Sequence, residues 1–581
     1  MSHCLPFVSC NPIETTVARL GRPIVPHVLD IRPNCVSALT SFRSSRLLRH
    51  ATTINAHIAS RDANVTGKEA RSEQWMVERA DKLKEEVCAL FETCNSIVGR
   101  MQLVDAVKRL GIDHLFKEEI DYTLSDINAR EFISPSLHDV ALRFRLLREH
   151  GFRVSPDVFN RFKGNDGRFN SGITEDPRGL LSLYNAAHLL VQDEPELEEA
   201  ISFAKHHLNS LSGRTDCKPH LIEQINRALD VPLPRAYRRM ETLHYMPEYG
   251  QEEGHIPILL ELAKLDFNLQ QHVHLKELKA ISEWWKDLYG YMGLSYIRDR
   301  VVESYVWSYV ALYEEGSALA RMIFTKIIAF IILMDDTYDS YATIEECRKL
   351  NEAIQRWDEN AIQFLPDYMK KLYIALLKTF KEFEAHVHVD GQHRIDFTKK
   401  EFQRLSAYYL QEAEWSHENY KPSFKEQVAL STITSTVPLL CVSTTVGRGD
   451  ALTKEAFEWA TSDIVATIAC AKITRFMNDI AAFKRGRKNR GDVASTVECY
   501  MSENKVTSES AFTKIDSLVE DEWKIINQAL CESREVLPAV QQVRNLAICA
   551  TFFYGNRKDA YTFSTHLQDT VESLFVKPIP I

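Results

Sequence analysis

The sequence of 581 residues is long enough for two or three domains with well-buried cores. Hydrophobic residues make up 45%, charged residues 26%, and the formal net charge is -10, a balance that is typical of an ordinary soluble protein and argues against a nucleic-acid partner. The 12 cysteines form no CxxC pair and no cluster with zinc-type spacing, as in a large intracellular protein with reduced thiols.

The first 65 residues differ in composition from the rest of the chain. They are rich in arginine and serine, contain no lysine, and hold only three acidic residues, Glu14, Asp30 and Asp62. This composition is typical of an organellar transit peptide and predicts a plastid protein. The alternative is a disordered tail without an address, in which case we expect the protein in the cytoplasm.

Beyond residue 66 the pattern predicts an all-α chain, because apolar residues recur at three- and four-residue spacing almost to the C-terminus. The stretch EYGQEEGHIP at 248–257 combines glycine and proline and precedes a long helical pattern. We therefore expect an N-terminal helical domain at 66–250 and a C-terminal helical domain at 251–581. No fixed-period repeat is visible, which argues against a helical solenoid.

The most apolar run, MIFTKIIAFIILM at 322–334, ends directly at the sequence DDTYD. At 13 residues, and with Lys326 inside it, the run is too short to cross a membrane, so we expect no transmembrane segment. On a helix, residues four apart share a face, so Asp335 and Asp339 should point the same way, with Asp336 beside them.

Carboxylates gathered beside apolar surface are unfavourable unless they take up protons or a cation neutralises them. Hard carboxylate oxygens suit Mg²⁺, and Mn²⁺ is an alternative. The motif therefore predicts a metal site. A helix end that emerges into solvent would explain the same residues without a metal.

Basic residues in two other segments suit a diphosphate. Arg298 and Arg300 lie upstream of DDTYD, and arginine forks bind phosphate oxygens well. Downstream, Arg475 and Asn478 are three residues apart, so both should face the same side of a helix.

Aromatic residues gather in the same parts of the chain. Such residues are more often core packing, although a ring face can also stabilise a cation. They are Trp284, Trp285, Trp307, Phe552, Phe553, Tyr554 and Tyr561.

Over about residues 70–581 the chain resembles the plant class I terpene synthases. The resemblance rests on motifs in the family's order and spacing: RDR at 298–300, Trp307, DDTYD at 335–339, R-x-x-N-D at 475–479 and YGNRKDAY at 554–561. It implies an N-terminal helical barrel-like domain without its own chemistry, followed by a C-terminal class I terpenoid synthase helical bundle that holds the active site.

The resemblance also implies an activity and a partner. The substrate would be a prenyl diphosphate, farnesyl or geranyl diphosphate, and Mg²⁺ would trigger the loss of diphosphate. The carbocation left behind would be cyclised or quenched to a sesquiterpene or monoterpene, and we expect a monomer.

Roles follow by matching positions. The implied metal ligands are Asp335, Asp336, Asp339 and Asn478. The implied diphosphate-binding residues are Arg298, Arg300, Asp335, Asp339, Arg475 and Asn478. The implied carbocation pocket contains Trp307, Tyr554 and Tyr561, with Asp559 orienting Tyr554.

The sequence departs from the family at two places. The second metal motif runs Asn or Asp, then Ser or Thr, then Glu at four-residue steps, whereas this chain has Asn478, Ala482 and Gly486. The stretch from Lys484 to Arg490 is basic instead, which is typical of a solvated loop but also offers positive charge to a diphosphate. The paired arginines ahead of a tryptophan found in many cyclising members are also absent near Trp75.

Three functions fit these residues. The first is an active terpene synthase. The second is a catalytically silent relative that binds a prenyl diphosphate or a partner chain, which the damaged second motif favours. The third is a chain-elongating prenyltransferase, which would need a second aspartate-rich cluster that NDIAA does not supply. The core is most similar to the farnesyl-using branch of the family, whereas a plastid address would favour geranyl diphosphate.

Overall fold

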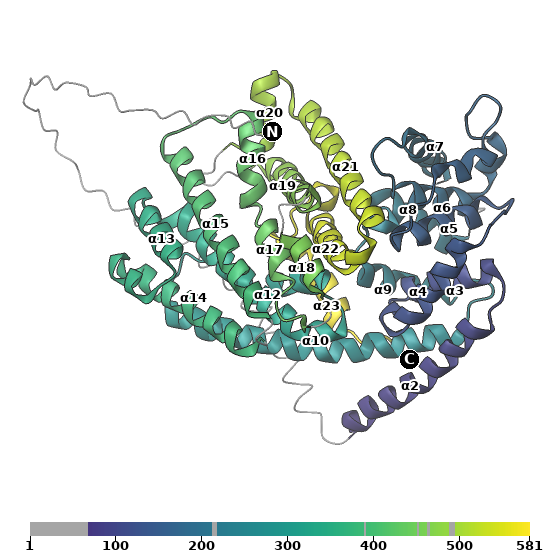
Figure 1. Ribbon diagram of the computed structural model, residues 1–581, viewed down its shortest axis with the longest axis horizontal. Helices are drawn as coiled ribbons and strands as arrows, with labels where there is room; N and C mark the ends of the chain where they lie inside the picture. Colours follow the sequence, from purple (N-terminus) through teal and green to yellow (C-terminus); the bar gives the residue numbers. More distant parts are fainter. Residues whose placement is uncertain (1–67, 212–217, 388–390, 450–451, 462–464, 487–493) are drawn as a thin grey trace, which may run out of the picture. The chain divides into compact units, whose positions relative to one another are not determined.

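The computed structural model describes residues 68–211, 218–387, 391–449, 452–461, 465–486 and 494–581, which belong to one compact unit. The predicted transit peptide at 1–65 lies outside the described residues. The described residues contain helices and one isolated bridge between Lys163 and Phe169, but no β-strand, so the all-α prediction is confirmed (Figure 1).

The predicted boundary at residue 250 lies in the connection between Tyr249 and Pro257, and it stays a prediction because the described residues form one compact unit. Before this connection lie α2 (Lys68–Thr93), α3 (Ile97–Arg109), α4 (Lys117–Ala129), α5 (Leu137–Glu149), α6 (Pro177–Ala187), α7 (Pro195–Leu211), α8 (Pro219–Asp230) and α9 (Arg238–Tyr249). After it lie α10 (Pro257–Met292), α11 (Val301–Ala311), α12 (Ala318–Asp336), α13 (Ile344–Arg356), α14 (Asp367–His386), α15 (Gln392–His417), α16 (Phe424–Thr434), α17 (Val437–Ser443), α18 (Lys454–Thr461), α19 (Val465–Arg485), α20 (Thr496–Asn504), α21 (Ser508–Glu532), α22 (Leu537–Tyr554) and α23 (Gln568–Phe575). Short 3-10 turns are η1 (Asp113–Leu115), η2 (Pro156–Phe162), η3 (Ser171–Glu175), η4 (Leu233–Arg235), η5 (Glu315–Ser317), η7 (Glu359–Phe364), η10 (Arg534–Val536), η11 (Gly555–Arg557) and η12 (Ser564–His566), and η6 (Thr337–Tyr341) is a π-helix.

The apolar run of the sequence forms the buried helix α12. Its residues from Ile323 to Met334 are buried except Lys326, which lies over the Trp284 ring and 3.6 Å from Glu382. A helix that is apolar on all sides must be surrounded by protein, and α12 packs against α10, α11, α14 and α17. Asp335 and Asp336 therefore come at the point where a core helix ends.

From the spacing of the aspartates we expected one regular α-helix through DDTYD, but the structure differs there. The α-helical pattern stops at Asp336, and Thr337–Tyr341 forms a single π-helical turn. Such widened turns are rare and often occur at functional sites. Thr343 and Glu346 then form a capping box that starts α13.

Helices from the two sides of the connection pack on one another through α21 and α22. Arg235 forms two hydrogen bonds with Glu520 of α21 at 2.7 and 2.8 Å. The Asn527 amide donates to the carbonyl oxygens of His188 and Leu190 at 3.1 and 2.9 Å. In Figure 1, α21 accordingly lies beside the N-terminal helices.

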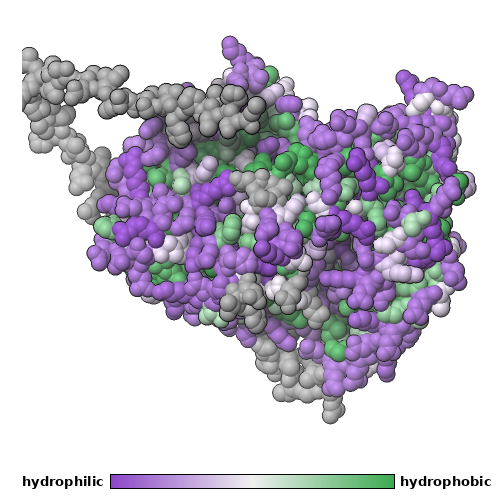
Figure 2. Space-filling model, in the orientation of Figure 1, coloured by the Kyte–Doolittle hydropathy of each residue, from purple (hydrophilic) through white to green (hydrophobic). Residues whose placement is uncertain are grey.

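The visible surface is mainly hydrophilic, and hydrophobic residues show mostly in recesses between helices (Figure 2). Among the described residues, no helix combines the length and apolar character needed to span a membrane. The apolar residues instead form the core, which runs continuously through both sets of helices.

Candidate active site

A cavity of about 1150 Å³ lies beside the C-terminal end of α12. Its lining comes from α12 and η6, from α15 and α19, and from the segment that follows α22. It contains all of the predicted site residues except Arg300. Segments distant in sequence thus meet around one space.

The first wall of the cavity carries Asp335, Asp336 and Asp339, as predicted from their spacing. The Arg298 side chain reaches both members of the first pair: Nη2 donates to Asp335 Oδ2 and Nε donates to Asp336 Oδ1, each at 2.6 Å. The Arg298 backbone N–H also donates to Asp336 Oδ2 at 2.8 Å. Asp336 is thus held by Arg298, whereas Asp335 and Asp339 are the more exposed carboxylates.

Burial raises the pKa of Asp336 to about 6, and the charge of Asp335 adds to this rise, although Arg298 opposes it. Two carboxylates are therefore crowded at the end of an apolar helix with one arginine between them. A cation that arrives beside Asp335 would relieve this repulsion.

The second wall is formed by α19. Arg475 donates to Thr434 Oγ1 at 3.2 Å and to the Ser431 carbonyl oxygen at 3.4 Å, which fixes its side chain toward the cavity. The Asn478 side chain lies close enough to the Tyr554 hydroxyl to oppose the rise of that tyrosine's pKa. Asp479 accepts hydrogen bonds from the backbone and the hydroxyl of Thr496, both at 2.8 Å, so its carboxylate anchors the start of α20.

The two positions at which the second metal motif lacks its ligands also lie on this wall. Ala482 and Gly486 both line the cavity. Gly486 follows the last residue of α19 and has a φ of 69°, in the left-handed region that favours glycine. The chain therefore lacks a carboxylate there and also leaves the helix at that point.

Glu412 of α15 is a cavity residue that the sequence analysis missed. Burial raises its pKa to about 7, and the charges of Asp335 and Asp479 add to the rise, while Arg475 and a hydrogen bond from Thr434 oppose it. A single glutamate in a long helix without a surrounding motif carries no sequence signal. Only the packing of α15 places it among the other carboxylates.

The charges of the cavity suit divalent cations. Among the described lining residues, seven carboxylates face three arginines, and no group of three side chains is already arranged as a metal-binding cluster. Mg²⁺ commonly takes one or two carboxylates and completes its shell with water and substrate phosphates. Asp335 and Asp339 fit this role, whereas the surroundings of Asn478 offer few ligands.

Aromatic rings form the apolar part of the cavity. Trp307 stacks on Phe553 with centroids 4.8 Å apart and an angle of 8°, and Tyr561 stands edge-on to Trp307 at 6.2 Å. Tyr554 lies on the same side of the cavity. Burial raises the pKa of both tyrosines well above 10, so both remain neutral phenols. These rings offer faces and edges to a ligand but no negative charge.

Two predicted residues lie differently from the expectation. Arg300 is not among the residues that line the cavity: Nη1 donates to Glu303 at 3.0 Å and Nη2 donates to the carbonyl oxygen of Thr562, a lining residue, at 2.7 Å. Asp559 was expected to orient Tyr554, but its Oδ2 accepts from Arg485 at 2.6 Å and its Oδ1 accepts from the Thr562 N–H at 2.8 Å. Its charge adds to the rise that burial causes in the pKa of Tyr554.

Comparison with known proteins agrees with this geometry. Residues 54–229 match the terpene synthase N-terminal domain, and residues 286–525 match the metal binding domain of the terpene synthase family. The chain belongs to the terpene synthase family. It is therefore a lyase that acts on a prenyl diphosphate, and the comparisons give no support to a catalytically silent protein.

Relatives of this terpene synthase are similar over most of their length. Tau-cadinol synthase from Zea mays is 50% identical over 517 residues, covering 88% of this chain and 94% of that protein. The (+)-delta-cadinene synthase isozyme XC14 from Gossypium arboreum is 41% identical over 509 residues, covering 87% of this chain and 91% of that protein.

Solved structures of terpene synthases share the fold. Isoprene synthase from grey poplar leaves (Populus x canescens), in complex with three Mg²⁺ ions and dimethylallyl-S-thiolodiphosphate, matches with a TM-score of 0.79 and 31% identity, covering 87% of this chain and 97% of that chain. Limonene synthase with 2-fluorolinalyl diphosphate matches with a TM-score of 0.80 and 28% identity, covering 87% and 95%. The match to the family's metal binding domain, together with the Mg²⁺ ions in the isoprene synthase complex, indicates that this terpene synthase uses a divalent metal.

Proposed function

We propose that this terpene synthase is a sesquiterpene synthase that uses Mg²⁺ and farnesyl diphosphate. The observation that carries the proposal is one cavity in which Asp335 and Asp339 face the same space as the rings of Trp307, Tyr554 and Tyr561. The sesquiterpene synthases among its relatives support the choice of substrate. Residues 66–250 and 251–581 are its two domains in this proposal, which is consistent with family matches that end at 229 and resume at 286.

The charged walls bind and orient the diphosphate. Arg475 is held by Thr434 and Ser431 and presents its guanidinium to the cavity, where it favours negative charge that develops on the leaving group. Arg298 is shared between Asp335 and Asp336, and it gains a further partner when diphosphate enters. Asp335 and Asp339 would hold divalent ions, which would supply Lewis-acid charge to the diphosphate when bound.

The aromatic wall receives the hydrocarbon part of the substrate. Once diphosphate leaves, the allylic cation is stabilised by the faces of Trp307 and the two tyrosines. Because these rings are packed against Phe553 and are largely buried, they also exclude water that would quench the cation early. The length of the hydrocarbon that this wall accepts decides between farnesyl and geranyl diphosphate.

The test is a product assay with the full chain. We expect farnesyl diphosphate with Mg²⁺ to give a sesquiterpene by gas chromatography and mass spectrometry, with less product from geranyl and geranylgeranyl diphosphates. Replacing Mg²⁺ with Mn²⁺ in the same assay tests the alternative metal. If the protein turns over only geranyl diphosphate, the assignment of farnesyl diphosphate as substrate is wrong. If a folded protein makes no product from any of the three diphosphates, the proposed function is wrong.

Two further parts of the proposal concern the state of the protein in the cell. We propose that the chain is a monomer, which light scattering on the purified protein tests directly. The arginine- and serine-rich composition of residues 1–65 supports plastid targeting. A fluorescent protein fused behind these residues should enter plastids, and a cytoplasmic signal would reject the transit-peptide assignment.

A further inference from the structure

The last residue of α19, Arg485, is a cavity residue that matches none of the family motifs considered above. It lines the same space as Asp335 and Arg475. Its Nη1 donates to Asp559 Oδ2 at 2.6 Å, and its guanidinium lies 5.6 Å from the centroid of the Phe563 ring. Asp559 is buried and is itself fixed by the Thr562 N–H, so it holds the guanidinium in place.

Arg485 still has hydrogen-bonding capacity. Its Nε is buried and has no partner among the described residues. The Arg485 side chain is 22% exposed to solvent, and it borders the cavity. A guanidinium has five N–H donors in a planar fork that matches phosphate oxygens. One carboxylate therefore fixes the group without using up its donors.

The part of the wall around Arg485 is poor in metal ligands. Ala482 has no ligating atom in its side chain, and Gly486 has neither a side chain nor a helical backbone. Asp479 is committed to the Thr496 backbone and hydroxyl. A diphosphate that contacts this wall therefore needs positive charge from another source than metal ions held by these residues.

We propose that Arg485 binds the diphosphate of the substrate and supplies the positive charge on the α19 wall. The inference rests on the proposed function, because it assigns a further contact to the same leaving group. The diphosphate would then contact two guanidiniums, Arg475 and Arg485, while Asp335 and Asp339 would hold the divalent cations. Asp559 positions Arg485 and does not touch the substrate.

The adjacent basic residue provides a matched control. Lys484 is part of the same basic run, but its ammonium lies 5.8 Å from the centroid of the Phe512 ring and it does not line the cavity. A general effect of basic charge near the active site would involve Lys484 as much as Arg485. A specific contact would involve Arg485 alone.

The experiment measures binding of inorganic diphosphate by calorimetry at a fixed Mg²⁺ concentration, together with kcat and KM for farnesyl diphosphate. We expect Arg485→Gln to weaken diphosphate binding by about 10-fold or more, since it removes a charge-assisted hydrogen bond. Arg485→Lys should restore part of the affinity, and Lys484→Gln should stay within about twofold of the unchanged protein.

A second variant protects the test against a folding defect. Arg485→Gln leaves the buried Asp559 without its ion-pair partner, so the double variant Arg485→Gln/Asp559→Asn removes both charges. Each variant is compared by circular dichroism and thermal melting. If both bind diphosphate like Lys484→Gln, Arg485 is a structural residue and the inference is wrong.

The outcomes separate the inference from the proposed function. Normal sesquiterpene formation together with unchanged diphosphate affinity in both Arg485 variants would reject the inference alone. Diphosphate binding that depends on Arg485 in a protein that yields no sesquiterpene would reject the proposed function and support the inference.

Discussion

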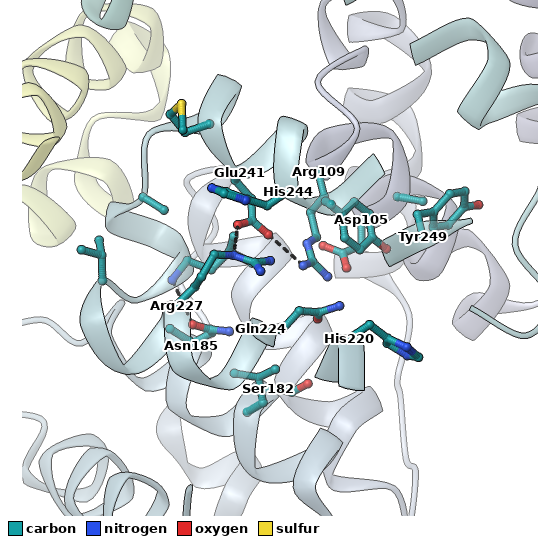
Figure 3. A pocket seen from close by; sticks show the side chains of 18 of the residues that line it. Asp105, Arg109, Ser182, Asn185, His220, Gln224, Arg227, Glu241, His244 and Tyr249 are labelled. Carbon is teal, nitrogen blue, oxygen red and sulfur yellow. Dashed lines mark hydrogen bonds and ion pairs between the residues drawn. The ribbon is translucent and has the colours of Figure 1, made fainter. Parts of the chain in front are cut away.

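Two large cavities of the described chain differ in how their charged side chains are paired. The first, of about 1280 Å³, is lined mainly by the N-terminal helices, and the second is the active-site cavity of about 1150 Å³. In the first, Glu241 lies between two arginines: it accepts from Arg109 at 2.8 Å and from Arg227 at 3.4 Å (Figure 3). Arg227 also binds both oxygens of Glu248.

The pairing continues around the first cavity. Arg145 forms an ion pair with Asp105 at 2.5 Å, and the Arg109 guanidinium covers the Tyr245 ring at 3.6 Å from its centroid. In the active-site cavity, by contrast, acidic side chains outnumber the arginines. The two cavities are similar in size, but among their described lining residues the first has seven lysines and arginines against five acidic side chains, whereas the active-site cavity has seven acidic side chains against three arginines. The sign of the excess charge therefore separates the two, and only the active-site cavity is suited to cations.

One segment of the chain forms a wall of both cavities. Phe552, Phe553 and Lys558 line the first cavity, whereas Tyr554 and Tyr561 line the second. The two cavities therefore share this segment of the chain, and substitutions in each cavity can test its role separately.

The largest expected effect is on the active-site side. Asp335→Ala and Asp339→Ala should each lower turnover of farnesyl diphosphate by about 10³-fold, equivalent to about 4 kcal/mol, because each removes a metal ligand. Thermal stability of the metal-free protein should change by about 1 kcal/mol at most, since the Arg298–Asp335 pair is partly exposed.

The control for these aspartates is Asp367→Ala, which removes an exposed carboxylate that pairs with Lys370 on the surface. It should leave kcat and KM unchanged. Unchanged product formation in Asp335→Ala or Asp339→Ala would remove the metal assignment.

The next largest effect is expected in the first cavity, where it concerns the stability of the protein. Glu241→Ala leaves two arginines without their shared partner in a largely buried site and should destabilise the protein by about 3 kcal/mol. A melting curve measures the loss, and kcat per folded molecule should stay the same. If Glu241→Ala lowers kcat without lowering the melting temperature, the first cavity is not a structural network.

A smaller effect is expected at the aromatic wall. Trp307→Phe keeps a ring against Phe553 but loses the larger indole face, which is worth about 0.5 to 2 kcal/mol to a nearby cation. The proportion of early-terminated or alcohol products should rise several-fold while the affinity for diphosphate holds.

The matched control is Trp523→Phe, because Trp523 is buried under Arg235 and is not among the residues that line the active-site cavity. It should lower stability and leave the product ratio unchanged. Equal product ratios in both variants would make Trp307 a packing residue only.

The smallest effect concerns the incomplete metal motif. The double variant Ala482→Ser/Gly486→Glu should lower the Mg²⁺ concentration for half-maximal rate by about two- to fivefold, since it restores ligands. Because Gly486 has a φ of 69°, a glutamate there should also cost about 1 to 2 kcal/mol of stability.

Gly293→Glu is the control for that strain. Gly293 ends α10 with a φ of 67° and has open space around it, but it does not line the cavity. It should lose similar stability without any change in Mg²⁺ dependence. An unchanged Mg²⁺ dependence in the double variant as well would show that the missing ligands are not limiting.

Local patterns in the sequence predicted much of the fold and one wall of the site. The three- and four-residue spacing of apolar residues predicted the helices, and the spacing of Asp335 and Asp339 predicted that the two side chains point the same way; both line the cavity. These features depend on the order of nearby residues, which helical geometry converts directly into a shared face.

The features that escaped prediction depend on contacts between distant segments. Glu412 reaches the cavity only because α15 packs there, and the pair of Arg485 and Asp559 joins residues 74 positions apart. Arg300 was expected at the diphosphate, but Glu303 and the Thr562 carbonyl oxygen hold it elsewhere. No periodicity in a single sequence contains such pairings.

The contacts of α21 with the N-terminal helices limit how enzymes of this type can be recombined. A chimera cut in the connection between α9 and α10 would place Arg235 opposite a foreign residue at position 520 and the His188 and Leu190 carbonyl oxygens opposite one at position 527. Glu520 and Asn527 should therefore be transferred together with helices α6 to α9. A hybrid that keeps these partners matched should fold, whereas one that separates them leaves buried polar groups unpaired even though every helix is intact.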